Sequence, residues 1–283
     1  MDIHLEHLRS WIGRSVDEED RVGTTPLRAL AATLDCDDAP WIAGQAIPAC
    51  WHWLYFLPIH PQADIGADGH ARCGEFLPPV PLPRRMWAGS RIEFLAPIRV
   101  GEPLARRSCI EDVRLKQGRS GPLVFVEVRH DIRSGGRPAI VERHDIVYRE
   151  LPRADVAVPA ALPAPADAQW TRRIVPDPVL LFRYSALTFN GHRIHYDRRY
   201  VTEVEGYPGL VVHGPLIATL LLESLRRERP DARVARFAFK ALAPIFDTAP
   251  FEVCGRLEGE RQARLWARTP AGQLAMDAGA TLS

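Results

Sequence analysis

The strongest hydrophobic pattern in the chain is a long apolar segment in its second half. The segment PLIATLLLESLRRERPD, residues 215–231, is apolar on nearly every side at first, and arginines and Pro230 follow. A helix that is apolar on all faces is a buried helix, and basic residues followed by a proline are typical of a helix C-terminus. The pattern predicts a buried helix near Gly214, with Gly214 as its N-cap and Pro215 at its first position.

Short stretches with alternating polar and apolar residues follow this predicted helix. Alternation bounded by turn residues is the pattern of half-buried strands, so these stretches predict an antiparallel meander. Ahead of the helix, RRIVPDPVLLFRYSALT, residues 172–188, is also strand-like. The four stretches of the meander are residues 233–246, 251–260, 262–272 and 273–283.

A similar order is found in the first half of the chain. The sequence TTPLRALAATLD, residues 24–35, predicts a helix with Thr25 as its N-cap and Pro26 at its first position. An aromatic-rich segment closed by prolines comes next, residues 47–58. The predicted strands that complete this half are residues 86–102, 108–117, 122–136 and 137–150.

The two halves are separated by a segment without periodicity. Residues 151–170 read LPRADVAVPAALPAPADAQW, a composition typical of a semi-rigid, solvated linker. We therefore expect a first domain over residues 1–150, the linker over 151–170 and a second domain over 171–283. The repeated order resembles the double hot-dog fold, an α+β class in which each half is an antiparallel sheet wrapped around a long helix.

Composition excludes some classes of partner. The chain has 283 residues, 36 Lys and Arg against 35 Asp and Glu, and 46% hydrophobic residues. A net charge of +1 gives no overall electrostatic reason to bind nucleic acid or an anionic membrane. No apolar run approaches 18 residues, so no membrane-spanning segment is expected.

The cysteines and the N-terminus indicate a cytoplasmic protein. The five cysteines are dispersed and form no CxxC motif, which predicts reduced thiols without a disulfide framework or a zinc site. The sequence MDIHLEHLRS at the N-terminus has neither the apolar core of a secretion signal nor an arginine-rich transit pattern.

Candidate chemistry is concentrated between Thr188 and Leu216. This stretch holds His192, His195 and His213, three of the ten histidines in the chain. Imidazole is the side chain that both accepts and donates protons near neutral pH, so His195 is a candidate acid/base.

Asn190 and Gly214 supply the other two components of a catalytic site. Asn190 cannot be a base but can orient water or a carbonyl by hydrogen bonds. Free N–H groups at the start of the helix near Gly214 can stabilise a developing oxyanion. Together with a base, these groups suit the addition of water to an α,β-unsaturated thioester, and the reverse elimination.

The motifs FNGHRIH and VVHGPL give this stretch a family resemblance. It resembles the signature of the (R)-specific enoyl-CoA hydratases, the MaoC-like hot-dog family. The resemblance implies that His195 is the catalytic histidine and that Asn190 stands where the family has its catalytic aspartate. His192 stands at the family's Asn and Arg193 at its Pro, and the chain lacks the carboxylate of the usual His/Asp pair.

A narrower resemblance covers most of the chain. The longer form of the motif, with WHWLYFLP and MWAGSRIEFLAPIRVGE in the first half, is similar to the bacterial mesaconyl-C4-CoA (3-methylfumaryl-CoA) and itaconyl-CoA hydratases. It is equally similar to the type 2 hydroxyacyl-thioester dehydratases. The resemblance implies an enzyme that hydrates mesaconyl-C4-CoA or itaconyl-CoA to citramalyl-CoA, with a non-catalytic first half that shapes the acyl tunnel.

Several residue roles stay open at the level of sequence. Asn190 either orients water or substrate, or caps a turn. His192 and His213 either bind substrate or are structural, with the backbone at Gly214 acting in place of the His213 side chain. Arg193 either binds a substrate carboxylate or a CoA phosphate, or forms a surface ion pair. Asp197 either starts a helix or orients the imidazole of His195.

Alternative functions also stay open. They are a 3-hydroxyacyl-thioester dehydratase of fatty-acid metabolism, a hot-dog thioesterase, and a thioester-binding protein without catalysis. We expect no metal, because the three histidines lack carboxylate or cysteine partners at zinc-site spacing. We also expect no cofactor beyond the coenzyme A of the substrate. The sequence leaves a homodimer possible.

Overall fold

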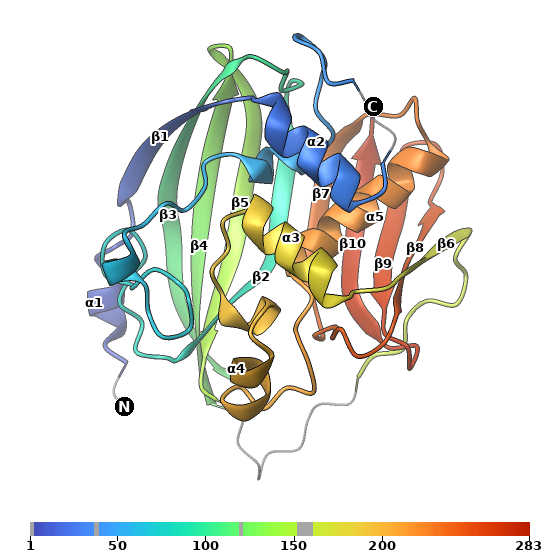
Figure 1. Ribbon diagram of the computed structural model, residues 1–283. Coiled ribbons are helices and arrows are strands. Elements are labelled where there is room, and N and C mark those ends of the chain that lie inside the picture. The colour runs from blue at the N-terminus through green and yellow to red at the C-terminus, as the bar shows by residue number, and fades with distance from the viewer. Residues whose placement is uncertain (1–2, 37–39, 119–120, 152–160) are drawn as a thin grey trace.

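A computed structural model describes residues 3–36, 40–118, 121–151 and 161–283. Within these residues, ten strands form one sheet in the order β1-β3-β4-β5-β2-β7-β10-β9-β8-β6, and neighbouring strands are antiparallel (Figure 1). The first half supplies β1 (Ser15–Arg21), β2 (Arg84–Phe94), β3 (Pro103–Gly118), β4 (Gly121–Ser134) and β5 (Arg137–Arg149). The second half supplies β6 (Trp170–Ile174), β7 (Val234–Ala241), β8 (Phe251–Leu257), β9 (Gln262–Arg268) and β10 (Leu274–Leu282).

The sheet is continuous across the two halves. Residues Gly89 to Glu93 of β2 pair antiparallel with residues Arg236 to Lys240 of β7. Both meanders therefore share one hydrogen-bonded surface, and the side chains on its concave face can contribute to a common site.

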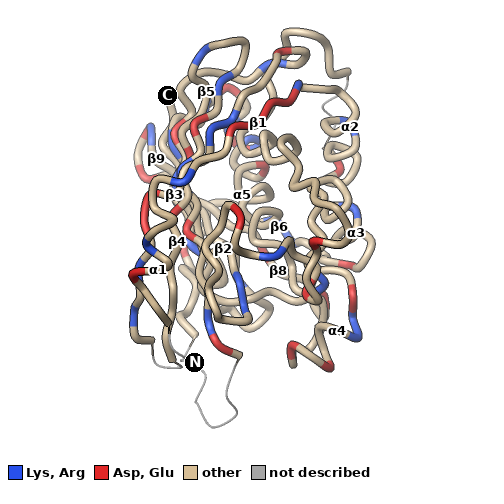
Figure 2. Tube along the Cα trace, turned by 90° about the vertical axis from the view of Figure 1, so that its left-hand side faces the viewer, with Lys and Arg blue, Asp and Glu red and all other residues tan. Residues whose placement is uncertain are grey.

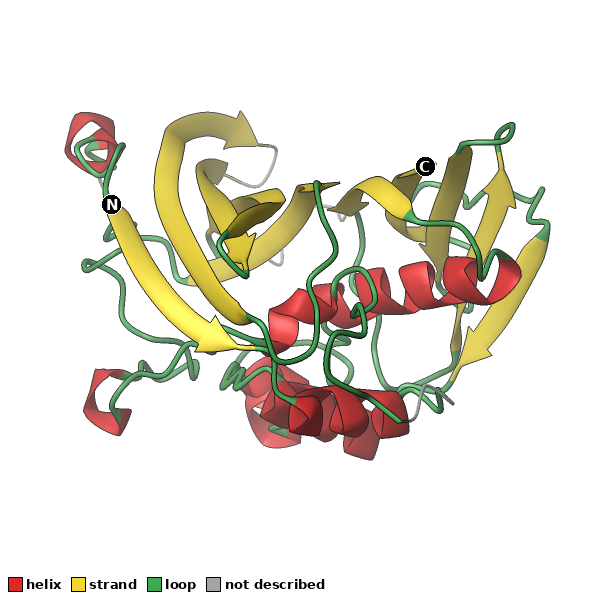
Figure 3. Cartoon of the chain, turned by 90° about the horizontal axis from the view of Figure 1, so that it is seen from above, coloured by secondary structure: helices red, strands yellow, loops and turns green. Residues whose placement is uncertain are grey.

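The predicted helix at Gly214 is present. Helix α5 (Gly214–Glu228) lies along the concave face of the second half (Figure 3), and every residue from Leu216 to Leu225 is buried. Its N-cap is His213 rather than Gly214. A difference of one residue at a helix end is within the range over which helices fray.

The first half differs from the expectation that each half encloses a long helix. Its described helices are α1 (Leu5–Arg9), α2 (Thr24–Thr33) and two short 3-10 turns, η1 (Trp51–Leu54) and η2 (Gln62–Asp64). Figure 3 shows the strands of this half curling around without a long helix inside them. The segment that would have to form one is rich in prolines, which remove backbone donors and interrupt helices.

Two local predictions were wrong, and one strand was not predicted. Helix α2 begins at Thr24 with Gly23 as its N-cap, so Thr25 is inside the helix. The strand-like segment 172–188 is a strand only as far as Ile174 and then becomes helix α3 (Pro178–Leu187). Asp177 caps this helix by accepting hydrogen bonds from the backbone of its first turn. The first half also contains β1, which the sequence did not predict. Five of the seven residues in SVDEEDR are charged, a composition that is uncommon in strands.

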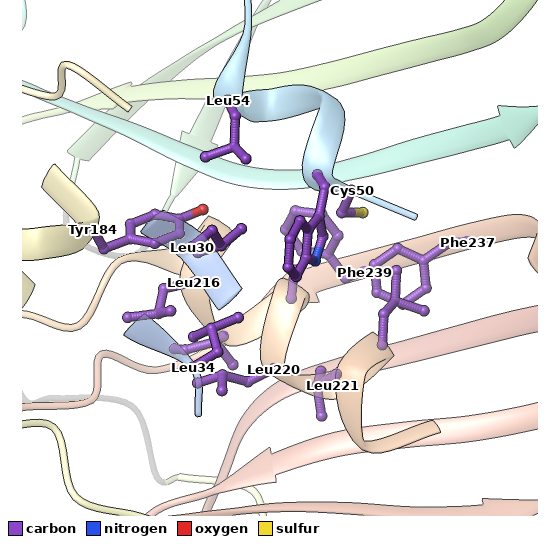
Figure 4. Close-up of a cluster of buried hydrophobic side chains, with 14 of the residues drawn as sticks. Leu30, Leu34, Cys50, Leu54, Tyr184, Leu216, Leu220, Leu221, Phe237 and Phe239 are labelled. Atoms are coloured by element: carbon purple, nitrogen blue, oxygen red, sulfur yellow. The ribbon is translucent and has the colours of Figure 1, made fainter. Parts of the chain in front are cut away.

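The main core spans the junction of the two halves. Figure 4 shows side chains of α2, α3, α5 and β7 in contact, among them Leu30, Tyr184, Leu220 and Phe239. Helix α2 from the first half packs against α3 from the second (Figure 1). Because one core serves both halves, the junction is fixed by apolar packing as well as by the β2–β7 ladder.

The predicted linker lies partly outside the described residues, which omit 152–160. Its described end packs on the second half: Ala164 donates its N–H to the Gly272 carbonyl, and Leu162 accepts from the N–H of Leu274. The division into domains 1–150 and 171–283 stays a prediction. Charged residues of both signs alternate along the surface in Figure 2, in line with the balanced composition. In the described parts of the chain, no helix has both the length and the apolar character needed to cross a bilayer.

Candidate active site

A cavity of about 1110 Å³ opens between the two halves. The second half lines it with the loop from Thr188 to Tyr196 and with the start of α5. The first half lines it with side chains of β2, β4 and β5 and with the segment that precedes β2. A concave site of this size with a few polar groups is typical of a small-molecule site, and it contains most of the predicted site residues.

His195 is placed as a neutral base in this cavity. It ends the 3-10 turn η3 (Arg193–His195), is 7% exposed, and donates from Nδ1 to the Val211 carbonyl at 2.7 Å. This hydrogen bond leaves Nε2 as the proton acceptor. Burial lowers the pKa of His195 to about 4, although the hydrogen bond to Val211 opposes the shift.

Asn190 holds the turn that leads to His195. Its Oδ1 accepts from the N–H of His192 at 3.0 Å, and its own N–H donates to the Ser185 carbonyl. Phe189, just before it, has the left-handed φ of 49°, which is uncommon for a residue with a side chain. Among the described residues, none accepts a hydrogen bond from Nδ2 of Asn190, so this amide group is available to a ligand. Asn190 thus caps the turn with its oxygen and can still donate with its nitrogen.

His213 lies behind His195 rather than in the cavity. The two rings stack with centroids 3.7 Å apart and an interplanar angle of 18°. His213 is fully buried, and its Nε2 bonds the hydroxyl of Ser185 at 2.8 Å. Burial holds the pKa of His213 well below its usual value. The predicted substrate-binding role of its side chain does not fit this position; the residue supports the plane of the His195 ring.

His192 does face the cavity, but with a partner from the other half. Its ring lies 4.0 Å from the ring of His70, and it meets His195 edge to face at 5.4 Å. His70 in turn bonds Asp68 through Nδ1 at 2.8 Å. Burial lowers the pKa of His192, and the neighbouring imidazoles add to this shift.

Arg193 and Asp197 are paired with each other outside the cavity. The guanidinium bonds Asp197 at 2.7 Å, donates to the Ala67 carbonyl, and lies over the ring of Tyr200. Asp197 also caps helix α4 (Arg198–Glu203) by accepting from the N–H of Tyr200. The structure therefore favours the ion-pair alternative for Arg193, and Val211 rather than Asp197 orients His195.

Gly214 brings the start of α5 to the cavity wall. It is the first residue of the helix, and no described residue accepts a hydrogen bond from its N–H. A side chain at this position would lie 3.9 Å from the Trp87 carbonyl, so the first half closes over the helix end. The free N–H groups of a helix N-terminus are suited to bind developing negative charge.

The loop of residues 65–72 in the first half contacts the loop of residues 188–196, which we call the catalytic loop because it carries the candidate base His195. Gly69 has a φ of 90°, and a Cβ there would lie 1.8 Å from the Gly191 carbonyl oxygen. Arg193 donates its N–H to the Asp68 carbonyl at 2.9 Å. Sequence reasoning missed this loop, because its only signal is the short Asp-Gly-His run at 68–70.

Asp68, His70 and His192 offer ligand atoms that all lie within 4.8 Å of one another. Of the three histidines expected to lack a carboxylate partner, His192 therefore does have one nearby, in Asp68. The rings of His70 and His192 are tilted by 38° with their centroids 4.0 Å apart, and Nδ1 of His70 is already bonded to Asp68.

A second polar cluster lines the cavity from the first half. Glu142, 1% exposed, accepts from Nε2 of His52 at 2.9 Å and from Oγ of Ser90 at 2.7 Å, and His144 Nε2 lies 2.7 Å from it. Burial alone would raise the pKa of Glu142, but His144 and His52 hold it well below its usual value. No sequence motif predicts this cluster, because its members come from three separate elements, η1, β2 and β5.

The fold is a double hot dog, and the cavity at the junction of its halves is the candidate active site. A MaoC-like dehydratase from Phytophthora capsici superposes with a TM-score of 0.68 at 12% identity, covering 99% of this chain and 98% of that one. A Mycobacterium tuberculosis protein described as having a double hotdog fold superposes with a TM-score of 0.59 at 13% identity, covering 96% of each chain. The expected fold class is confirmed.

The sequence model of the family hydroxyacyl-thioester dehydratase type 2 matches residues 50–247, and the chain belongs to this family. It is 49% identical over 271 residues, 95% of each chain, to the mesaconyl-C(4)-CoA hydratase of Chloroflexus aurantiacus. It is 28% identical to the mitochondrial hydroxyacyl-thioester dehydratase type 2 of Schizosaccharomyces pombe, over 72% of this chain and 76% of that one. These matches confirm the family that the motif suggested.

Proposed function

We propose that the protein is a hydro-lyase that adds water to mesaconyl-C4-CoA and forms citramalyl-CoA. The observation that carries the proposal is the buried, neutral His195 beside the free N–H groups of α5. The 49% identity to a mesaconyl-C(4)-CoA hydratase supports the choice of substrate. Itaconyl-CoA, which gives the same product, belongs to the same class of branched C5-dicarboxylyl thioesters.

In this proposal His195 serves both proton transfers. Nε2 removes a proton from water as its oxygen bonds to Cβ, and the electrons of the double bond move to the thioester carbonyl. The N–H of Gly214 binds the resulting enolate oxygen. The imidazolium then returns a proton to Cα, and the carbonyl re-forms. Nδ2 of Asn190 holds the water or the thioester by donating a hydrogen bond.

The 3-hydroxyacyl-thioester dehydratase of fatty-acid metabolism is the second candidate. The family match and the fission-yeast relative favour it. A dehydratase would catalyse the reverse reaction with the same residues. Only the acyl group of the substrate therefore distinguishes it from the mesaconyl-C4-CoA hydratase. A thioesterase is less well supported, because the group that orients His195 is the Val211 carbonyl rather than a carboxylate.

The test is a comparison of substrates under one set of conditions. Loss of the enoyl-thioester absorbance would be followed with mesaconyl-C4-CoA and crotonyl-CoA. Itaconyl-CoA, whose double bond is not conjugated with the thioester, would be followed by chromatography, and all products would be identified by mass spectrometry. We expect the highest kcat/KM with mesaconyl-C4-CoA. A preference for crotonyl-CoA would favour the fatty-acid dehydratase, release of free coenzyme A a thioesterase, and binding without turnover a scaffold.

We also propose that the reaction needs no cofactor other than the coenzyme A of the substrate, and that the protein acts in the cytoplasm. The five cysteines, all in described parts of the chain, form no disulfide, which supports a reducing compartment. Activity that survives prolonged dialysis against a chelator would support the absence of a metal. Size-exclusion chromatography with light scattering would decide whether the chain is a homodimer.

A further inference from the structure

The proposed substrate carries a negative charge into the cavity. In mesaconyl-C4-CoA the free carboxylate and a methyl group are attached to Cβ, the carbon that water attacks. A carboxylate that leaves water without a compensating cation carries a large desolvation cost. If the proposed function holds, on which this inference rests, the cavity should supply a cation close to the catalytic loop.

Most arginines near the cavity are already engaged. Arg193, the residue that the sequence suggested, is bound to Asp197. Arg106 is paired with Glu18 at 2.6 Å and lies over the ring of Phe56. These side chains neutralise charges of the protein itself and are not free to bind an anion.

Two further arginines, Arg84 on β2 and Arg149 on β5, lie opposite each other, and Arg149 also lines the cavity. Arg84 is buried against Glu205 at 2.7 Å and also donates to the hydroxyl of Tyr207. Arg149, which pairs with Arg84 across the strands, donates to the same hydroxyl. Side chains directly opposite on paired strands lie on the same face of a sheet, so these two arginines share the face that contacts the loop around Glu205.

Arg85 lies on the other face, toward the cavity. Successive side chains of a strand alternate, so Arg85 and Trp87 share one face of β2. The ring of Trp87 packs against Trp53 and Phe239, and all of these aromatic residues lie at or beside the cavity. Tyr148, directly opposite Arg85 on β5, is fully buried on that side.

The guanidinium of Arg85 has no anionic partner in the described structure. Its Nη1 lies 3.6 Å from the sulfur of Cys73, a weak acceptor, and no described carboxylate is within 4 Å of it. Arg85 is also near the catalytic loop. Burial is the main cause that lowers the pKa of His70 and of His192, and the positive charge of Arg85 adds to both shifts. A half-buried arginine that faces a cavity and has only the neutral partners Cys73 and Tyr148 is suited to bind a carboxylate.

We propose that Arg85 binds the free carboxylate of the acyl group and thereby makes the site selective for dicarboxylyl thioesters. Two parallel N–H···O bonds would fix the orientation of Cβ toward His195. A phosphate of coenzyme A is the other anion that the guanidinium of Arg85 would bind. The choice of substrate distinguishes the phosphate from the carboxylate. The phosphates are present in every CoA thioester, whereas the carboxylate is present only in the dicarboxylyl ones.

The experiment measures kcat/KM of wild type, Arg85→Gln and Arg85→Lys with mesaconyl-C4-CoA and with crotonyl-CoA. Arg173→Gln is the matched control, because Arg173 is exposed on β6 and does not line the cavity. We expect R85Q to lose about 10²-fold with mesaconyl-C4-CoA and less than about threefold with crotonyl-CoA, the usual worth of a charge-assisted pair. R85K should recover part of the loss, because it restores the charge but not the fork.

Other outcomes would overturn the proposal. An equal loss with both substrates would mean that Arg85 binds a phosphate or supports the fold, and a melting curve separates the two. A shift of the acid limb of the pH profile with both substrates, without a change in their ratio, would mean that Arg85 acts only on the charge of the histidines. If wild type turns over crotonyl-CoA but not mesaconyl-C4-CoA, the proposed function itself fails, and this inference with it. If wild type hydrates mesaconyl-C4-CoA and R85Q does so equally well, only this inference fails.

Discussion

His195 owes its proposed role to its surroundings. A solvated imidazole is partly protonated near neutral pH, whereas burial lowers the pKa of His195 to about 4 and keeps the ring neutral there. The Val211 carbonyl fixes the tautomer, and the ring of His213 fixes the plane. The base is therefore ready before substrate binds, without the carboxylate that pairs with histidine in the wider family.

The first prediction concerns the removal of this base. We expect His195→Ala to lower kcat by about 10²- to 10⁴-fold, the usual worth of a positioned general acid/base. Circular dichroism and thermal melting would confirm that the variant is folded. A folded variant with kcat near wild type would move the role to His192, since Asp197 is bound to Arg193.

The second prediction concerns the departure from the family's aspartate. In Asn190→Asp a carboxylate can still accept from the N–H of His192, but the donor at Nδ2 is lost. The new negative charge should also raise the pKa of His195. We expect a decrease in kcat of at least about tenfold and a shift of the acid limb of the pH profile to higher pH. An N190D enzyme faster than wild type, with an unshifted profile, would show that the amide donor has no part in the reaction.

At the scale of elements, the catalytic loop depends on a loop of the other half. The backbones of Gly69 and Gly191 are in direct contact, and Asp68 accepts a hydrogen bond from the backbone of Arg193. The first half was expected to shape the acyl tunnel. It also supplies His70 to the site and sets the position of the residues that precede His195.

The third prediction tests this contact with glycine substitutions. In Gly69→Ala the new Cβ would meet the Gly191 oxygen at 1.8 Å, so one of the loops must move. A displacement of about 1 Å at a catalytic group can cost about 10²-fold in rate, and we expect a loss of this order in kcat.

Gly44→Ala is the matched control for that experiment. Gly44 has a similar φ of 82°, but a Cβ there meets nothing within 4 Å. We expect the Gly44→Ala variant to lose about 1 kcal/mol in the free energy of unfolding, because alanine is strained in the left-handed conformation. Its kcat should be unchanged. Equal effects of the two substitutions on kcat would contradict the proposed role of the contact.

At the scale of the whole molecule, the buried histidines couple folding to pH. Burial lowers the pKa of His192, His195, His213 and His130 below the usual value. Below about pH 6.5 the unfolded chain binds protons at these positions that the folded chain does not bind. Stability is therefore full above this pH and decreases as the pH falls toward the pKa values of the folded state.

The fourth prediction follows from this linkage. Denaturant unfolding between pH 7.5 and 5 should show a free energy of unfolding that decreases with falling pH, by up to about 1.4 kcal/mol per pH unit for each such histidine. The carboxylates with lowered pKa, such as Glu142, respond only at lower pH. His195→Ala should show a shallower decrease, because it removes one of the groups. A free energy that is constant or rises between pH 6.5 and 5 would contradict the prediction.

The sequence by itself determined the parts of this protein that depend on local patterns. The apolar run after Gly214 predicted α5, and the alternating stretches predicted β7 to β10, since period and turn residues are local properties. The motif around His195 identified the family, and the catalytic loop is indeed one continuous segment. Local signals failed where the same apolar run could form either a strand or a helix. Residues 178–187 were predicted to be strand-like, but they form α3 because Asp177 caps a helix there.

Only the tertiary structure decided which half completes the site. Arg193 bonds the Ala67 carbonyl across 126 positions of sequence, and His70, Arg85 and Glu142 reach the cavity from three separate segments of the first half. Such contacts depend on how the two meanders join at β2 and β7 and on which face each strand residue presents. The tertiary structure also decided that Arg193 is paired with Asp197 and that Arg85 has no carboxylate partner among the described residues. Burial sets the charge of the histidines next to His195.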